Sequence, residues 1–173
     1  MVFKFEVILK FNFPDIHPAL YIVSIPIGTI SDISFRALNV LSKANIILAE
    51  DTRKAKKLFY LCNLDFKNKK FIKYNDNEIR NEKKRQLVID EIENGKFVAL
   101  ISDAGTPLIA DPGYKLVKLA VEKKCEIINI PGPCALISAL VISGLATNNF
   151  FFSGFVPKKK VDRDKFFKNL KDF

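Results

Sequence analysis

The chain contains little of several residue types that catalysis and metal binding often use. It has no tryptophan, one histidine and three cysteines. A single histidine, His17, disfavours a Ser-His-Asp type of mechanism. The three cysteines show no CxxC spacing and have no histidine partners, so we expect no metal site; their odd number is typical of a protein from a reducing compartment. They are Cys62, Cys125 and Cys134.

Long apolar runs and two well-known nucleotide motifs are also missing. No apolar run approaches the ~20 residues that a membrane-spanning helix requires. Lys4, Glu6 and Lys10 interrupt anything that resembles a signal-peptide core. Neither GxGxxG nor GxxxxGK[ST] occurs, which disfavours a nicotinamide-binding Rossmann site and a P-loop. We therefore expect a cytoplasmic protein with no membrane contact.

The composition that is present is apolar and basic. Hydrophobic residues make up 49% of the 173 positions, enough for a core, and the length suits one domain or two small lobes. The formal net charge is +9, from 28 basic and 19 acidic residues. This excess favours a polyanionic partner such as nucleic acid, although a general bias toward Lys, Ile, Asn and Phe explains it equally well.

Strand-like and helix-like segments alternate from residue 20 onward. Such alternation predicts the α/β class with a mainly parallel sheet. Ser31 or Asp32 is the expected cap of the first helix. Strands are predicted at residues 20–25, 45–50, 71–74, 97–101, 126–130 and 150–156, and helices at residues 31–44, 52–60, 80–94, 112–124 and 134–144.

Five of the predicted strands are followed by a polar or Gly/Pro-rich loop. The carboxyl ends of parallel strands meet at one edge of a sheet, so we expect these loops to converge on one crevice. His17 lies before the first strand, at the opposite edge, and we interpret it as structural. The loops are residues 26–28, 50–53, 74–78, 102–113 and 131–133.

The most informative of these is the 102–113 loop, with the sequence SDAGTPLIADPG. It holds two carboxylates, Asp103 and Asp111, and two hydroxyls, Ser102 and Thr106, but no Lys or Arg. Carboxylates without cations suit a cationic or hydroxyl-rich ligand better than a phosphate. The alternative is a connection whose Gly and Pro only satisfy turn geometry, but a loop of this length favours function.

The segment Glu50-Asp51-Thr52-Arg53 allows two interpretations. In the structural one, Asp51 or Thr52 caps a helix and Arg53 pairs with an acid. In the functional one, a carboxylate deprotonates a hydroxyl and Arg53 holds a phosphate. The residues alone favour neither.

Together these segments resemble a known family. LYIVSIPIG at residues 20–28, RAL at 36–38, AEDTR at 49–53, SDAGTPLI at 102–109, DPGY at 111–114 and PGP at 131–133 occur in order. This combination is similar to the ribosomal RNA small subunit methyltransferase I family of the tetrapyrrole methylase superfamily. The resemblance extends from about residue 20 to about residue 160, and AEDTR together with SDAGTP makes it specific.

The resemblance implies a two-lobed α/β fold with S-adenosylmethionine between the lobes, in a homodimer. It implies 2′-O-methylation of a cytidine in small-subunit (16S) ribosomal RNA, with that RNA or the 30S subunit as partner. The corresponding domains would be an extension at residues 1–18, a first lobe at 19–111 and an incomplete second lobe at 112–173. Glu50, Asp51 and Arg53 are the catalytic candidates: Glu50 or Asp51, with Asp103 as a third choice, would act as the base, and Arg53 would hold a phosphate or the substrate. Matching by motif places cofactor contacts at Pro26, Ser102, Asp103, Ala104, Gly105, Ala110, Asp111, Pro131, Gly132 and Ala135.

The sequence departs from the family in three ways. It is shorter than its relatives, it carries residues 1–18 as an extension, and it lacks the histidine that relatives often have near residues 74–78. Two alternatives therefore remain open. One is methylation of a tetrapyrrole or another small molecule by the same fold, although such relatives generally have a glycine-rich first loop. The other is a truncated, inactive remnant.

Overall fold

The computed structural model describes residues 15–76 and 81–170, and of Asn81 it describes the backbone alone. Most of the expected extension, residues 1–18, lies outside this part. The chain divides into two compact units, Met1–Ala135 and Leu136–Phe173, which are described separately below.

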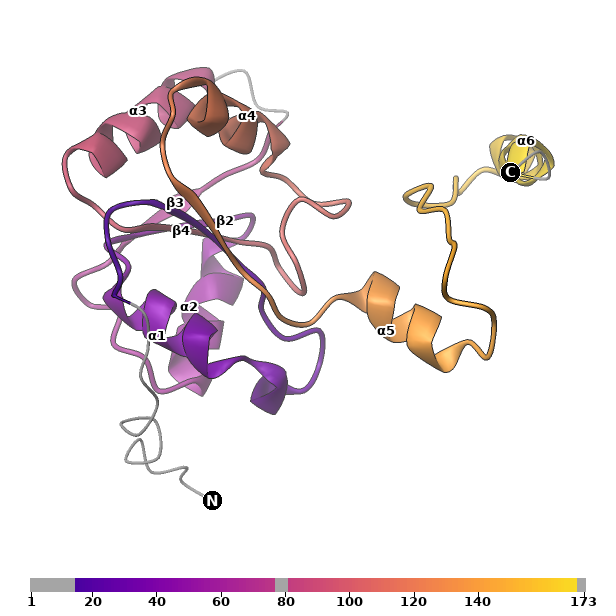
Figure 1. Ribbon diagram of the computed structural model, residues 1–173, viewed down its shortest axis with the longest axis horizontal. Helices are drawn as coiled ribbons and strands as arrows, with labels where there is room; N and C mark the ends of the chain where they lie inside the picture. Colours follow the sequence, from indigo (N-terminus) through magenta and orange to yellow (C-terminus); the bar gives the residue numbers. More distant parts are fainter. Residues whose placement is uncertain (1–14, 77–80, 171–173) are drawn as a thin grey trace. The chain divides into compact units, whose positions relative to one another are not determined.

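The first unit is built around one five-stranded parallel sheet, with the strand order β3-β2-β4-β1-β5 (Figure 1). This confirms the α/β class and the parallel sheet that the alternation predicted. Each strand is one to two residues shorter than predicted or shifted by one position. The strands are β1 (Leu20–Val23), β2 (Ile46–Ala49), β3 (Lys70–Lys73), β4 (Val98–Ile101) and β5 (Ile127–Ile130).

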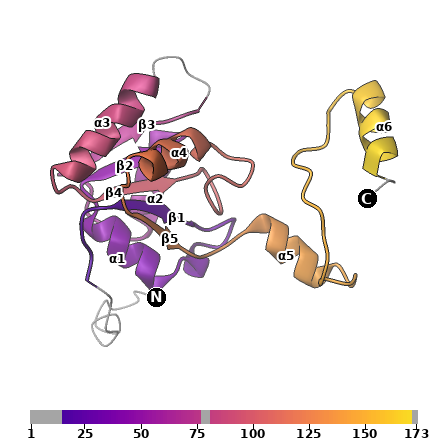
Figure 2. The same ribbon diagram turned by 45° about the horizontal axis from the view of Figure 1, so that its top comes forward.

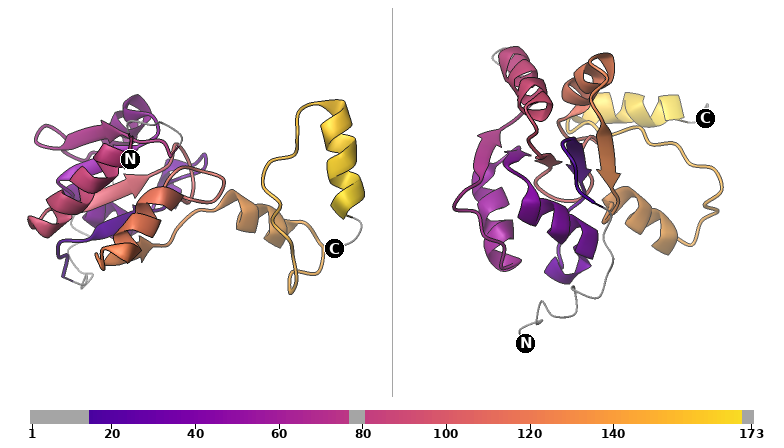
Figure 3. Two further views of the ribbon diagram at one scale, coloured as in Figure 1. Left: turned by 90° about the horizontal axis from the view of Figure 1, so that it is seen from above. Right: turned by 60° about the vertical axis from the view of Figure 1, so that its left-hand side comes forward.

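Helices cover both faces of the sheet (Figures 1 and 2). α1 (Phe35–Lys43) and α2 (Thr52–Leu61) pack on one face, and α3 (Asn81–Glu93) and α4 (Tyr114–Glu122) on the other (Figure 3). Side chains of a strand alternate between faces. Accordingly, Ala99 and Ile101 of β4 join the core beneath α1 and α2, whereas Val98 and Leu100 join the core beneath α3 and α4.

The connections leave the sheet in opposite directions around β4. β1 and β2 lie on either side of β4 and lead to α1 and α2 on one face. β4 leads to α4 on the other face. Ligands of open α/β sheets bind outside the carboxyl ends of strands where connections diverge in this way. The topology therefore selects the carboxyl end of β4, where the 102–113 loop begins.

The first helix begins later than the sequence indicated. Residues Ile30–Asp32 form a 3₁₀ turn, and Ile33 is extended. Ser34 has the extended backbone that an N-cap requires, and its Oγ accepts a hydrogen bond from the Ala37 amide at 3.0 Å. The prediction that Ser31 or Asp32 caps this helix is therefore wrong. Several hydroxyl and acidic residues precede this helix, and spacing alone did not select among them.

The two compact units divide at a different residue from the end proposed for the first lobe. The first lobe is expected to end at Asp111, whereas α4 and β5 follow that residue and belong to the first compact unit. β5 pairs along its whole length with β1. The division falls instead after Ala135, the first residue of α5 (Ala135–Ile142).

The second unit contains helical and irregular segments in its described part. α6 (Lys160–Asn169) follows a stretch in which the predicted strand at residues 150–156 is not formed, so that prediction is wrong. A strand needs a neighbouring strand for its backbone hydrogen bonds, and residues 136–170 provide none. Large apolar side chains are exposed here, including Ile142, Leu145 and Phe155. No helix of the described residues is long and apolar enough to cross a membrane.

Candidate functional site

The loops that follow β1, β4 and β5 contact one another directly. Ile25 and Gly105 exchange backbone hydrogen bonds of 2.9 and 3.1 Å. The Thr106 hydroxyl donates to the Pro133 carbonyl at 2.9 Å and lies 3.0 Å from the Ser24 hydroxyl. These contacts join three strand ends that are up to about a hundred residues apart in sequence, as the convergence hypothesis predicted.

The loop after β2 is joined to the same region through Asp103. One Asp103 oxygen accepts the Asp51 amide at 3.1 Å, and the other accepts the Lys54 ammonium at 2.6 Å. The expectation that the carboxylates of the 102–113 loop have no cation nearby is wrong for Asp103. The cation comes from the first turn of α2, 49 residues earlier in the chain, so local sequence gave no sign of it.

Asp51 and Arg53 form the helix cap that one interpretation of this segment proposed. The Asp51 Oδ1 accepts hydrogen bonds from the Arg53 amide at 2.8 Å and from Arg53 Nε at 3.1 Å. Its Oδ2 accepts from Arg53 Nη2 at 2.7 Å. These hydrogen bonds hold the pKa of Asp51 well below its usual range. A carboxylate of such low basicity accepts protons poorly, so Asp51 is the weaker candidate base.

Glu50 has the opposite properties. Burial raises its pKa, and the negative charges of Asp103 and Asp111 raise it further. Burial also raises the pKa of Asp111, against the effect of a hydrogen bond from Ser102. Three carboxylates from two loops thus lie within electrostatic reach of one another, and the raised pKa makes Glu50 a better proton acceptor than Asp51. In residues 15–76 and 81–170, no group of three or more His, Cys, Asp or Glu is arranged to hold a metal ion.

The loop after β3 has a structural role, as its turn-forming residues suggested, and the contacts of Asp76 account for it. The buried Tyr74 hydroxyl donates to Asp76 Oδ1 at 2.7 Å, and Asp76 Oδ2 accepts the Gly113 amide at 2.8 Å. Burial and the bond to Asp76 both raise the pKa of Tyr74. Asp76 therefore fixes the start of α4 and the end of the 102–113 loop. Residues 77 and 78 of this predicted loop lie outside the described part.

The 102–113 loop contains unusual backbone conformations. Leu108 and Ala110 have φ values of 71° and 59°, which non-glycine residues seldom adopt. At Gly113, φ is 138°, and an added Cβ would lie 2.7 Å from Leu100 Cδ2. Strained residues of this kind persist where surrounding contacts determine them, and they cluster at functional sites.

The expected cofactor residues occupy the same edge of the sheet. Apart from Ala135, which begins α5, they lie in the loops after β1, β4 and β5. At Gly132, an added Cβ would lie 3.0 Å from Ser24 Cβ, so a glycine permits the close approach of two of these loops. Ser102 and Gly105 are buried, Pro26, Asp103 and Asp111 are half-buried, and Ala104, Ala110, Pro131, Gly132 and Ala135 are exposed.

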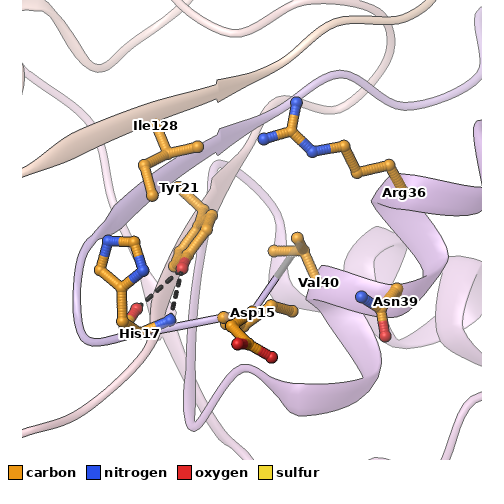
Figure 4. A pocket seen from close by; sticks show the side chains of 8 residues that line it. Asp15, His17, Tyr21, Arg36, Asn39, Val40 and Ile128 are labelled. Atoms are coloured by element: carbon orange, nitrogen blue, oxygen red, sulfur yellow. Dashed lines mark hydrogen bonds between the residues drawn. The ribbon is translucent and has the colours of Figure 1, made fainter. Parts of the chain in front are cut away.

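A separate pocket of about 90 Å³ lies at the amino end of β1 (Figure 4). The Tyr21 hydroxyl donates to the His17 carbonyl at 2.7 Å and accepts the His17 amide at 3.2 Å. His17 Nε2 lies 2.7 Å from Glu126 Oε2. These contacts tie the segment before β1 to the sheet, in agreement with the structural role expected for His17. Asp15, Ile16, Arg36, Asn39, Val40 and Ile128 complete the lining.

Comparison with known proteins gives a consistent result. The sequence pattern of the tetrapyrrole (corrin/porphyrin) methylases matches residues 19–172. A protein of Vibrio cholerae named ribosomal RNA small subunit methyltransferase I is 44% identical over 88% of this chain and 51% of its own length. Proteins of the same name from Buchnera aphidicola and Rickettsia prowazekii are each 45% identical, over 88% and 87% of this chain and 52% of their own lengths. The chain spans about half the length of the curated relatives it matches.

Proposed function

The chain belongs to the tetrapyrrole methylase family, and from this we propose that it binds S-adenosylmethionine and methylates the 2′-hydroxyl of a cytidine in small-subunit (16S) ribosomal RNA. The relatives are about twice as long as this chain. That this chain carries out the reaction named for them is therefore a proposal. The observation that supports it most is the meeting of four strand-end loops at the carboxyl end of β4, with Glu50, Asp103 and Asp111 among them.

The residues at this edge fit the proposed cofactor in charge. Four carboxylates, Glu50 and Asp51 after β2 and Asp103 and Asp111 after β4, face two cationic side chains, Arg53 and Lys54. An excess of negative charge suits a ligand that carries an ammonium and a sulfonium. Small residues would line the rest of the site, namely Pro26, Ser102, Ala104, Gly105, Ala110, Pro131, Gly132 and Ala135.

In the proposed reaction the protein has two tasks: it aligns the two reactants, and it accepts one proton. Bound S-adenosylmethionine supplies a methyl group on an already activated leaving group. The loops would hold the ribose hydroxyl in line with that methyl group. Glu50 would accept the hydroxyl proton, because its pKa is raised, and such assistance typically contributes ~10²–10⁴-fold. The Arg53 side chain, 90% exposed, would contact an RNA phosphate while Asp51 orients it.

The partners are proposed on the same basis. The net charge of +9 suits ribosomal RNA or the 30S subunit, and such a partner would require a protein in the cytoplasm. We also propose a homodimer, supported by the exposed apolar side chains at Ile142, Leu145 and Phe155. Light scattering after size-exclusion chromatography tests it: a mass near 40 kDa supports the dimer, and a mass near the 19.7 kDa of one chain contradicts it.

Methyl transfer to RNA tests the proposed activity. The chain is incubated with S-adenosylmethionine labelled in the methyl group and with small-subunit particles that lack the modification. Nucleosides from the digested RNA are then analysed by mass spectrometry. We expect labelled 2′-O-methylcytidine, and much less of it with Glu50→Gln. Label in a tetrapyrrole and not in RNA would favour the small-molecule alternative, and the absence of any transfer by a folded chain would contradict the proposed activity.

A further inference from the structure

Lys54 brings a positive charge to the acidic carboxylates after β2 and β4, and its position there was not predicted from the sequence. It is the third residue of α2, and its Nζ lies 2.6 Å from Asp103 Oδ2. The charges of Asp51 and Glu50 also favour its protonated form, after the dominant contribution of Asp103. Its neighbour Arg53 is committed to Asp51 through both carboxylate oxygens. Lys54 is therefore the lysine that balances Asp103.

Both oxygens of Asp103 are engaged in this arrangement. Oδ1 accepts the Asp51 amide, which is fixed in the backbone. Oδ2 accepts a hydrogen bond from the Lys54 ammonium. The Lys54 side chain is 62% exposed, so water can solvate the ammonium when it moves away from Asp103. Of the two contacts, only the one to Lys54 is free to change without moving the backbone. An ion pair with such an exposed lysine also contributes little free energy, so it is easily broken.

We propose that Lys54 is a displaceable internal counter-ion that occupies the place on Asp103 where the ammonium of the ligand binds. This inference rests on the proposed use of S-adenosylmethionine. A cationic ligand then gains the Asp103 contact only by releasing Lys54. Lys54 thereby lowers the affinity for any cation and makes binding depend on the further contacts that a nucleoside supplies, so it acts as a specificity-determining residue.

The effect on affinity is modest and has a definite sign. An exposed ion pair of this kind is weak, and its removal corresponds to a change of about two- to fivefold in a dissociation constant. Methionine is similar in length to the apolar methylene part of the lysine side chain. Lys54→Met therefore removes the charge with little change in that part. The variant should therefore bind a cationic ligand about two- to fivefold more tightly than the natural chain does.

The test compares three ligands and two variants by calorimetric titration. S-adenosylmethionine and S-adenosylhomocysteine both carry the ammonium, whereas 5′-methylthioadenosine has neither the ammonium nor the sulfonium. Lys54→Met should tighten the first two and leave the third unchanged. Lys57→Met removes the same charge from an exposed position of the same helix and controls for the overall field. It should change none of the three affinities by as much as twofold.

Each other outcome overturns a distinct claim. If the natural chain binds S-adenosylmethionine and Lys54→Met binds it equally or more weakly, the inference is wrong and the proposed function stands. If tightening is confined to S-adenosylmethionine, the sulfonium and not the ammonium competes with Lys54, which contradicts the placement proposed here. If the natural chain binds none of the three ligands, both the inference and the proposed function fail. A thermal melt of each variant by circular dichroism verifies that it is folded.

Discussion

Two variants of Asp103 test its proposed role in binding separately from its role in folding. Its Oδ1 accepts the Asp51 amide at 3.1 Å, and its Oδ2 pairs with the exposed Lys54. Asp103→Asn keeps an oxygen for the amide and removes the charge, whereas Asp103→Ala removes both. Leaving a half-buried amide without an acceptor costs about 1–3 kcal/mol, and losing an exposed ion pair costs about 0–1 kcal/mol.

The two variants should therefore differ in stability and agree in binding. We expect Asp103→Ala to melt about 2–4 °C lower for each kcal/mol lost, and Asp103→Asn to melt close to the natural chain. Both should bind S-adenosylmethionine at least about tenfold more weakly, since a hydrogen bond to a charged group contributes about 1.5–3 kcal/mol. Calorimetry and thermal melts measure the two effects. Natural affinity in Asp103→Asn would refute the assignment of Asp103 as the counter-charge.

Three further predictions concern stability. Tyr74→Phe removes the 2.7 Å hydrogen bond to Asp76 and should cost about 1 kcal/mol in urea denaturation, and an unchanged midpoint would contradict the role given to that bond. Gly113→Ala should cost about 2–4 kcal/mol, because φ is 138° and the new Cβ would meet Leu100 at 2.7 Å; Gly28→Ala, which has nothing within 4 Å, is the control and should be nearly neutral. Glu50→Gln should stabilise the chain at pH 7. Because the pKa of Glu50 is raised in the folded chain, ionisation of Glu50 disfavours folding. The stability of the natural chain is therefore fully present below the unfolded pKa of Glu50 and is partly lost as the pH rises through the folded pKa. The advantage of Glu50→Gln should accordingly vanish in melts near pH 4, where Glu50 is protonated in both states.

Much of the first unit was predictable because its signals are local. Short apolar runs such as residues 46–49 and 98–101 are too short for helices, and polar, Gly- or Pro-containing loops follow them. These two features predicted buried strands. The parallel arrangement followed from alternation with helices. The convergence of the loops followed from that arrangement, without any knowledge of the strand order.

What the sequence left undetermined depends on contacts between distant residues. The strand order, which makes the end of β4 the point of divergence, is not encoded in any one segment. The ion pair between Lys54 and Asp103 and the bond between Asp76 and the Gly113 amide join residues 49 and 37 positions apart. The predicted strand at residues 150–156 is apolar enough for a strand, but its backbone has no neighbouring strand in the described part of that unit.

The central claim is that S-adenosylmethionine binds at the carboxyl end of β4. The most direct test is a titration of the ¹⁵N-labelled chain with S-adenosylmethionine, followed by the amide signals in NMR spectra. We predict saturable shifts of the amides of Asp103, Gly105 and Gly132, with little change at His17 and Tyr21. Unchanged spectra, or shifts confined to the pocket beside His17, would contradict the account.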